Sequence, residues 1–228
     1  LKEGVDILLH AGGIYEHQDA VNSIRERTTE KERRKLDSIQ TDEALFKIAN
    51  AIAVCKPDAV FINTGTKADE ETVRRMSLDK GEEKKLALKD HTVHFDLPQE
   101  QARIIDRTFY IVNEDEQTSS LAKTRLRDDA YDYIREHMNG IMQGKTMLVG
   151  FFSRGPIGAE ASVPAIEITS STYVMHSADI LYRNVYARFD EEVRRAGHFF
   201  TNVHSEGPNR PEDLTNARIF MDRSWLTT

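Results

Sequence analysis

The chain has 228 residues, of which 39% are hydrophobic and 30% charged, with 12 glycines and 6 prolines. This composition supports a full core and excludes collagen-like, low-complexity and wholly disordered chains. Lys and Arg number 31 against 38 Asp and Glu, so the net charge of −7 provides no broad basic surface for nucleic acid. The single Cys55 cannot form an internal disulfide, and the start at Leu1 is not a signal peptide. No apolar run reaches the roughly 20 residues that span a bilayer, so we expect a cytoplasmic protein or a piece of one.

The first forty residues are the most highly charged part of the chain. Residues 21–36 mix both signs with few apolar positions, which is typical of an exposed helix or a mobile arm. We expect residues 1–40 to form a charged helical segment and residues 41–228 to form the domain. From Thr41 onward, Leu45, Ile48 and Ile52 recur at helical spacing and predict a helix that ends near Cys55.

The rest of the chain alternates between β-type and helical patterns. Strands are predicted at 59–62, 109–112, 147–152, 165–169, 199–204 and 218–222, and helices at 68–88 (broken near Lys80-Gly81), 128–142 and 177–195. The apolar run Met147–Phe152 indicates a strand that is covered on both faces. The order predicts an α/β fold, with a mixed or largely parallel central β-sheet flanked by helices. No linker marks a second domain.

One segment resembles a phosphate-binding loop and is a decoy. Gly140–Thr146 reads GIMQGKT, which has three residues between its glycines where a P-loop needs four. A P-loop also follows a strand and opens a helix, whereas here a predicted helix precedes and a predicted strand follows. We interpret Gly140 as the glycine that ends the helix before the strand begins.

Metal and nucleophile signatures are weak. His91 and His94, three residues apart on an extended segment, point to opposite faces, and one cysteine supplies no thiolate cluster. We therefore expect no metal site and no nucleotide cofactor site within this chain. No motif of the G-x-S-x-G type occurs, and Cys55 lies in an apolar helix where a buried, inert thiol is the common case.

Two stretches contain more specific candidates. Arg103 lies between a helical turn that begins at Pro98 and a predicted strand, where a guanidinium could bind a carboxylate with two hydrogen bonds or form an ordinary surface ion pair. Gly155 and Gly158 flank Pro156 after the buried strand, so the backbone there could approach a ligand or make a tight connection between strands.

These stretches carry a resemblance to a known family. The segments KTMLVGFFSRGPIG (145–158) and IEITSSTYV (166–174) resemble the N-terminal domain of GTP-type phosphoenolpyruvate carboxykinase. Pro57–Asn63 is similar to that family's P-D-x-(I/V)-x-(I/V)-x-(D/N) strand, and Ala102–Thr108 is similar to its A-R-(I/V)-E-(S/D)-(K/R)-T segment. The blocks occur in the family's order with similar spacing, from about Pro57 to Ser205.

The resemblance implies a lyase that decarboxylates oxaloacetate and phosphorylates the enolate to phosphoenolpyruvate, in gluconeogenesis or anaplerosis. Mn²⁺ and Mg²⁺ assist in the family, with GTP as donor, because the enolate needs cations until phosphoryl transfer captures it. By similarity Arg103 matches the arginine that holds the substrate carboxylate. Ile105 stands where the family often has Glu, so the role of that acid is lost or is taken by Asp106.

The family's other machinery lies downstream of the matched blocks. Its substrate loop, kinase P-loop, metal ligands and lid all follow the position of Thr228, so we expect an N-terminal substrate-binding domain that is inactive without its C-terminal nucleotide-binding domain. Arg154 replaces the methionine of the animal-type GTP enzymes, so a microbial GTP enzyme or a pyrophosphate-using relative stays open as an alternative. A non-catalytic ligand-binding or interaction domain of the same fold is a further alternative.

Overall fold

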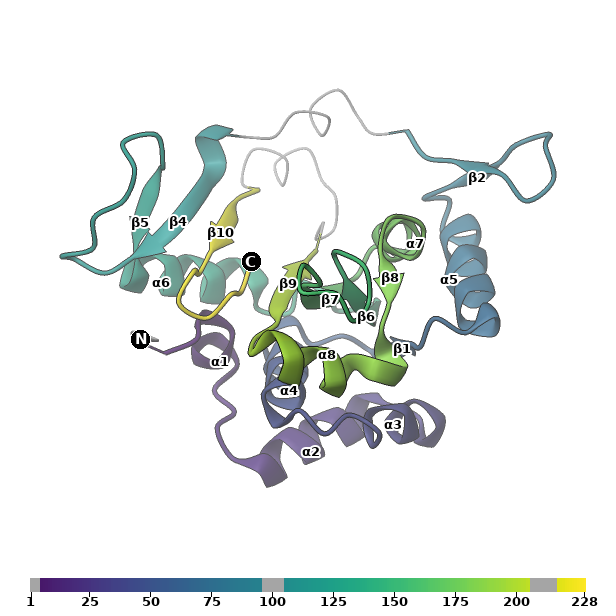
Figure 1. Cartoon of the computed structure of the whole chain (residues 1–228), viewed down its shortest axis with the longest axis horizontal. Helices are drawn as coiled ribbons and strands as arrows, with labels where there is room; N and C mark the ends of the chain where they lie inside the picture. The colour runs from purple at the N-terminus through teal and green to yellow at the C-terminus, as the bar shows by residue number, and fades with distance from the viewer. Residues whose placement is uncertain (1–4, 96–104, 206–216) are drawn as a thin grey trace.

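The centre of the fold is the long strand β6 (Thr146–Ser153) in a mixed sheet with strand order β1-β6-β7-β9 (Figure 1). The computed structural model describes residues 5–95, 105–205 and 217–228. In the sheet β1 (Ala59–Asn63) runs parallel to β6, β7 (Pro164–Thr169) antiparallel to it, and β9 (Phe200–His204) parallel to β7. The short β8 (Arg183–Asn184) pairs with the end of β6. The predicted α/β fold with a mixed central sheet is confirmed.

The apolar pattern of β6 is explained by cover on both faces. Met147, Val149 and Phe151 point into one core with no exposed surface, and Leu148 and Phe152 point into the other with at most 2% exposed. The first face is covered by α4 (Asp42–Cys55) and α8 (Phe189–Ala196), with α2 (His17–Arg27) packed on α4. The second face is covered by α5 (Lys67–Asp79) and α7 (Thr172–Leu181).

A second, three-stranded sheet lies beside the main one. Its strands β10 (Ile219–Met221), β4 (Thr108–Val112) and β5 (Thr124–Leu126) are all parallel. They pack with α6 (Arg127–Met138) and α1 (Ile7–Gly12) around Ile111, Ala130 and Ile134. The strand predicted at 109–112 is therefore present, but it belongs to this smaller sheet, at the left of Figure 1.

The charged N-terminal segment forms α2 and α3 (Glu30–Leu36), and part of it is not solvated. Glu32 is 6% exposed and accepts a hydrogen bond from the Ile62 amide (2.7 Å), while Lys35 donates to the Ile62 carbonyl (2.8 Å). These two side chains occupy the free edge of β1, which would otherwise offer unpaired backbone groups. The apolar Ile24 and Leu36 join the main core.

The predicted helix at 177–195 is wrong. Helix α7 ends at Leu181, the chain pairs as β8 with Phe152 and Ser153, and α8 begins only at Phe189 after the 3₁₀ turn η2 (Tyr186–Arg188). The reason is tertiary, because β1 pairs with β6 only as far as Gly150 and leaves the end of β6 without a partner on that side. The helical pattern of the local sequence contains no information about this unpaired edge of β6.

Two other helices end near a glycine. Helix α5 stops at Asp79, at the break predicted near Lys80-Gly81, and Gly81 (φ 74°) turns the chain toward a hairpin of β2 (Lys84–Lys85) and β3 (Thr92–Val93), where the sequence predicted more helix. Helix α6 stops at Met138, and Gly140 (φ 73°) starts the turn that leads into β6. The interpretation of the P-loop-like segment as a helix end before a strand is confirmed. The helices in the described ranges are all too short or too polar to span a bilayer.

Candidate functional site

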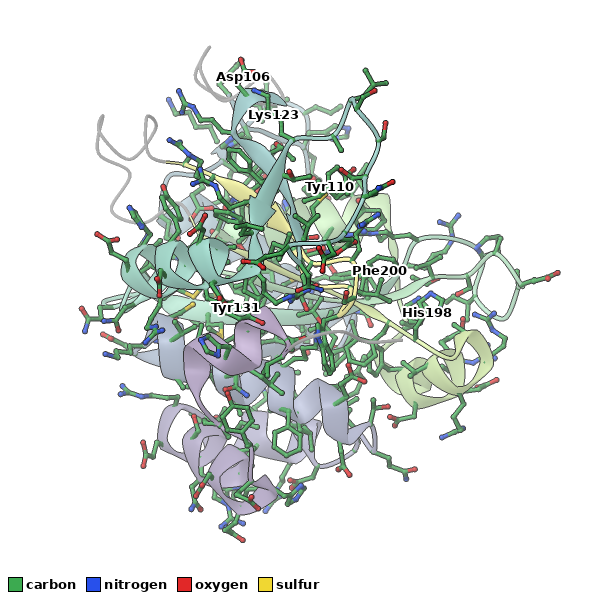
Figure 2. The ribbon with its side chains drawn as sticks, turned by 90° about the vertical axis from the view of Figure 1, so that its left-hand side faces the viewer. Asp106, Tyr110, Lys123, Tyr131, His198 and Phe200 are labelled. Carbon is green, nitrogen blue, oxygen red and sulfur yellow. The ribbon has the colours of Figure 1, made fainter. Side chains whose placement is uncertain are left out.

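Arg103, the proposed substrate residue, lies outside the described residues, so the site is built from what flanks it. On its C-terminal side the 3₁₀ turn η1 (Ile105–Arg107) leads directly into β4. There the Asp106 carboxylate accepts a hydrogen bond from Lys123, the residue before β5, and Figure 2 shows the two side chains together. This bond and the charge of Lys123 lower the pKa of Asp106. Lys123 was missed in the sequence, because only the β4–β5 pairing brings it near Asp106.

On the N-terminal side of Arg103 the chain is tied to α7 by Glu82, at the base of the β2–β3 hairpin. The Glu82 carboxylate accepts hydrogen bonds from the Ser171 hydroxyl and the Tyr173 amide, both at 2.8 Å. A carboxylate is well placed there, because the amides at a helix N-terminus carry partial positive charge. The motif at 166–174 thus supplies both β7 and the N-terminus of α7, and Glu82 joins it to the β2–β3 hairpin.

Three further contacts hold the same hairpin. The ring of His94 stacks on Tyr173 with 3.6 Å between centroids. Glu83, 6% exposed, accepts from Thr92 (2.6 Å) and pairs with His176 (2.8 Å). Burial alone would raise the pKa of Glu83, but its hydrogen bonds lower the pKa below the usual value. His94 therefore has a packing role, and nothing in the described hairpin resembles a metal centre.

The turn after β6 connects two strands and is held to α8 by hydrogen bonds. Ser153 shares a hydrogen bond with Ser162 (2.7 Å), and Ser162 in turn donates to Glu192 of α8, which has no exposed surface. Glu192 also accepts from the Gly158 amide (3.0 Å) and from Arg195 (2.8 Å). A Cβ on Gly155 would lie 2.5 Å from the Ala161 carbonyl oxygen, so this position has no room for a side chain. The described contacts of this turn are internal to the protein.

The block Pro57–Asn63 places Asn63 at the carboxyl end of β1, beside α7. Its amide nitrogen donates to both carboxylate oxygens of Asp179 (2.8 and 3.0 Å), and its Oδ1 accepts from the Gly65 amide (3.0 Å). Burial, aided by the like charges of Glu70 and Asp69, raises the pKa of Asp179 to about 6. The ends of β1 and β6 lie at the same edge of the sheet, where open α/β sheets commonly bind ligands.

A buried polar junction joins the two ends of the described chain, and the sequence patterns did not predict it. Lys47, 1% exposed, donates to Asp6 and to Thr227 (2.6 Å). Arg127 binds both carboxylate oxygens of Asp222 at 2.6 and 3.1 Å. A buried charge is tolerated only when it is paired. One sequence feature indicated a buried charge at this junction, namely Lys47, a lysine within the apolar pattern of α4.

Two expectations concern reactive groups. Cys55 is fully buried, and burial raises the pKa of its thiol to about 12, so the interpretation as an inert core thiol is confirmed. Across residues 5–95, 105–205 and 217–228, no group of three or more His, Cys, Asp or Glu side chains is arranged to hold a metal ion. The described part of the chain therefore does not fit the Mn²⁺ and Mg²⁺ that the resemblance implies.

Comparison with known proteins gives consistent matches. Residues 47–227 match the family model described as phosphoenolpyruvate carboxykinase N-terminal domain. The chain is 31% identical over 204 residues to the phosphoenolpyruvate carboxykinase [GTP] of Saccharolobus solfataricus, covering 90% of this chain and 32% of the relative. The corresponding enzyme of Thermococcus kodakarensis is 36% identical over 202 residues (86% and 32%), and that of Treponema pallidum 30% over 202 (85% and 32%). The chain spans about a third of the length of these relatives.

Proposed function

Because this chain belongs to the phosphoenolpyruvate carboxykinase N-terminal domain family, we propose that it is the substrate-binding domain of an enzyme that converts oxaloacetate to phosphoenolpyruvate and CO₂. The observation that carries the proposal is the match over residues 47–227 together with 30–36% identity to GTP enzymes. The proposed domain comprises residues 41–228, with residues 1–40 as a charged helical N-terminal segment.

Within this function Arg103 is the proposed ligand of the substrate carboxylate. A guanidinium offers two parallel N–H donors, which fit both oxygens of a carboxylate. Support comes from its flanks, because η1 is held at Asp106 and the preceding hairpin at Glu82. Among the described residues, the Asp106 carboxylate pairs with Lys123.

The phosphoryl donor is proposed to be GTP, since the three relatives are named as GTP enzymes. We assign the nucleotide and the metal ions to the part of the full-length protein that corresponds to the two thirds of the relatives this chain does not cover, because the resemblance places the P-loop and the metal ligands there. Chemically, this domain contributes substrate binding and orientation, while phosphoryl transfer takes place on groups that the other domain provides.

The test is an activity assay on the full-length protein that contains this chain. Purified protein is given oxaloacetate, Mn²⁺ and Mg²⁺ with GTP, ATP or pyrophosphate in separate reactions, and phosphoenolpyruvate is quantified. We expect product with GTP and little with the other donors. Product with pyrophosphate alone would overturn the assignment of the donor. No product with any donor, from a folded protein, would favour a non-catalytic binding domain.

A further inference from the structure

An open groove of about 200 Å³ lies between α7 and strand β7, and it includes Tyr173, on whose ring His94 stacks. Glu167 of β7 lines it, together with Tyr173, Ser177, Leu181 and Tyr182 of the α7 region. Its lining thus combines one carboxylate with aromatic and aliphatic side chains, a combination that suits a side chain with an apolar stem and a cationic head.

Glu167 is an acid that forms no ion pair among the described residues. Its carboxylate accepts one hydrogen bond, from Asn202 of β9 (3.0 Å). Across the sheet its neighbour in β6 is Gly150, which has no side chain to offer. The guanidinium of Arg154 lies 5.5 Å from the ring centre of Tyr182, and its charge acts on Glu167 only from a distance. Burial raises the pKa of Glu167. The Asn202 hydrogen bond and the Arg154 charge lower it, but they do not fully offset the loss of hydration of the carboxylate.

The helix beside the groove also presents apolar side chains to solvent. Met175 and Ala178 of α7 pack on the sheet with at most 5% exposed, whereas Ile180 and Leu181 are 71% and 64% exposed. Leu181 lines the groove itself, so the apolar surface and the carboxylate are continuous. Ile180 and Leu181 thus add exposed aliphatic surface beside the groove.

We propose that this groove, with Ile180 and Leu181 beside it, is the docking surface for the polypeptide that follows residue 228 in the full-length enzyme, which places a Lys or Arg opposite Glu167. The inference rests on the proposed function, because the relatives are about three times as long as this chain. The position of the last residue supports it. The Val203 amide of β9 donates to the Thr228 carbonyl (2.7 Å), and β9 lies next to β7, so Thr228 is about 10 Å, two strand spacings, from the strand of Glu167.

The experiment is site-specific photo-crosslinking in the full-length protein. A photo-crosslinking amino acid replaces Leu181, and in a matched control it replaces Leu121, which is 92% exposed and precedes β5 in the smaller sheet. After irradiation, the crosslinked peptides are identified by mass spectrometry. We expect Leu181 to crosslink within the same molecule to peptides beyond residue 228, at a yield about tenfold above that of Leu121. Crosslinks from Leu181 to a second copy, or yields equal to the control, would overturn the proposal.

The cationic contact is tested by two substitutions at Glu167 in the same background. Glu167→Gln keeps an oxygen that can accept from Asn202 but removes the charge, and Glu167→Lys reverses it. We expect the Leu181 crosslinking yield to fall several-fold in Glu167→Gln and further in Glu167→Lys, with circular dichroism unchanged. An unchanged yield in Glu167→Lys would rule out a cation opposite Glu167.

Failure of the docking proposal can be told apart from failure of the proposed function by assaying the same proteins for carboxykinase activity. Activity without the Leu181 crosslink would reject the surface and keep the function. The crosslink without activity would keep the surface and reject the function.

Discussion

At the scale of single residues, Arg103 gives the most direct test of substrate recognition. In the full-length enzyme, Arg103→Lys keeps the charge but loses the planar pair of donors, and Arg103→Gln loses both. A charge-assisted hydrogen bond contributes roughly 1.5–3 kcal/mol, so we expect kcat/KM for oxaloacetate to fall by about one to two powers of ten. The Gln variant should lose at least as much as the Lys variant, with GTP affinity nearly unchanged.

The control for Arg103 is Arg75→Gln, which removes an exposed arginine from α5 and should show wild-type kinetics. If Arg103 only formed a surface ion pair, its removal would also leave the kinetics unchanged. Asp106, one candidate for such a pair, is already bonded to Lys123. An Arg103→Gln enzyme within twofold of wild type would mean that the family's role was assigned to the wrong residue.

Asp179 provides a prediction about pH. Its folded-state pKa of about 6 is above the ordinary 3.8, so the ionised carboxylate destabilises the fold above pH 6, and this cost disappears as pH falls toward 4. Asp179→Asn removes the charge and keeps an oxygen in the side chain that faces Asn63. We expect the Asp179→Asn variant to melt a few degrees higher than wild type at pH 7.5, roughly 2–4 °C for each 1 kcal/mol gained.

The measurement for Asp179→Asn is the melting temperature at pH 7.5 and at pH 4.5, each compared with wild type. The advantage of the variant should shrink at pH 4.5, where most of the wild-type carboxyl is protonated. Asp132→Asn, at a side chain that is 83% exposed on α6, is the matched control and should show no such pH dependence. A constant difference at both pH values would contradict the assigned shift.

At the scale of elements, β6 organises the domain because both of its faces are buried. Val149 has no exposed surface, so Val149→Asp would bury an unpaired carboxylate at a cost of several kcal/mol, a large fraction of the roughly 5–15 kcal/mol by which domains are stable. We expect an unfolded or aggregated protein. Lys84→Asp, on the exposed strand β2, introduces the same residue in a solvated strand and should fold normally. A soluble Val149→Asp protein with an unchanged melting temperature would contradict this prediction.

At the scale of the whole molecule, the proposed division of labour predicts what residues 1–228 do alone. Purified as such, they should show no carboxykinase activity and no GTP binding by calorimetry, because the chain has no correctly spaced phosphate loop. Adding the C-terminal domain as part of one chain should restore both. Micromolar GTP binding by residues 1–228 would refute the assignment of the nucleotide site.

Local pattern determined much of this fold. The helix at 42–55 and the strands β1, β6, β7 and β9 lie where apolar spacing predicted them. Their apolar side chains are buried in the main core, and the spacing of such side chains depends on the type of element alone. The motif order also determined the family, which the match over residues 47–227 confirms. The role of Arg103 stays a prediction, since it lies outside the described residues.

The tertiary structure alone decided the rest. It placed β4 in a separate sheet, divided the predicted helix at 177–195 with β8, and joined Asp106 to Lys123. It also buried charged side chains such as Glu32 and Lys47, whose partners Ile62 and Asp6 are 30 and 41 residues away. A charged residue is stable inside a protein only when another polar group pairs with it, and the local sequence carries no record of which distant groups will meet.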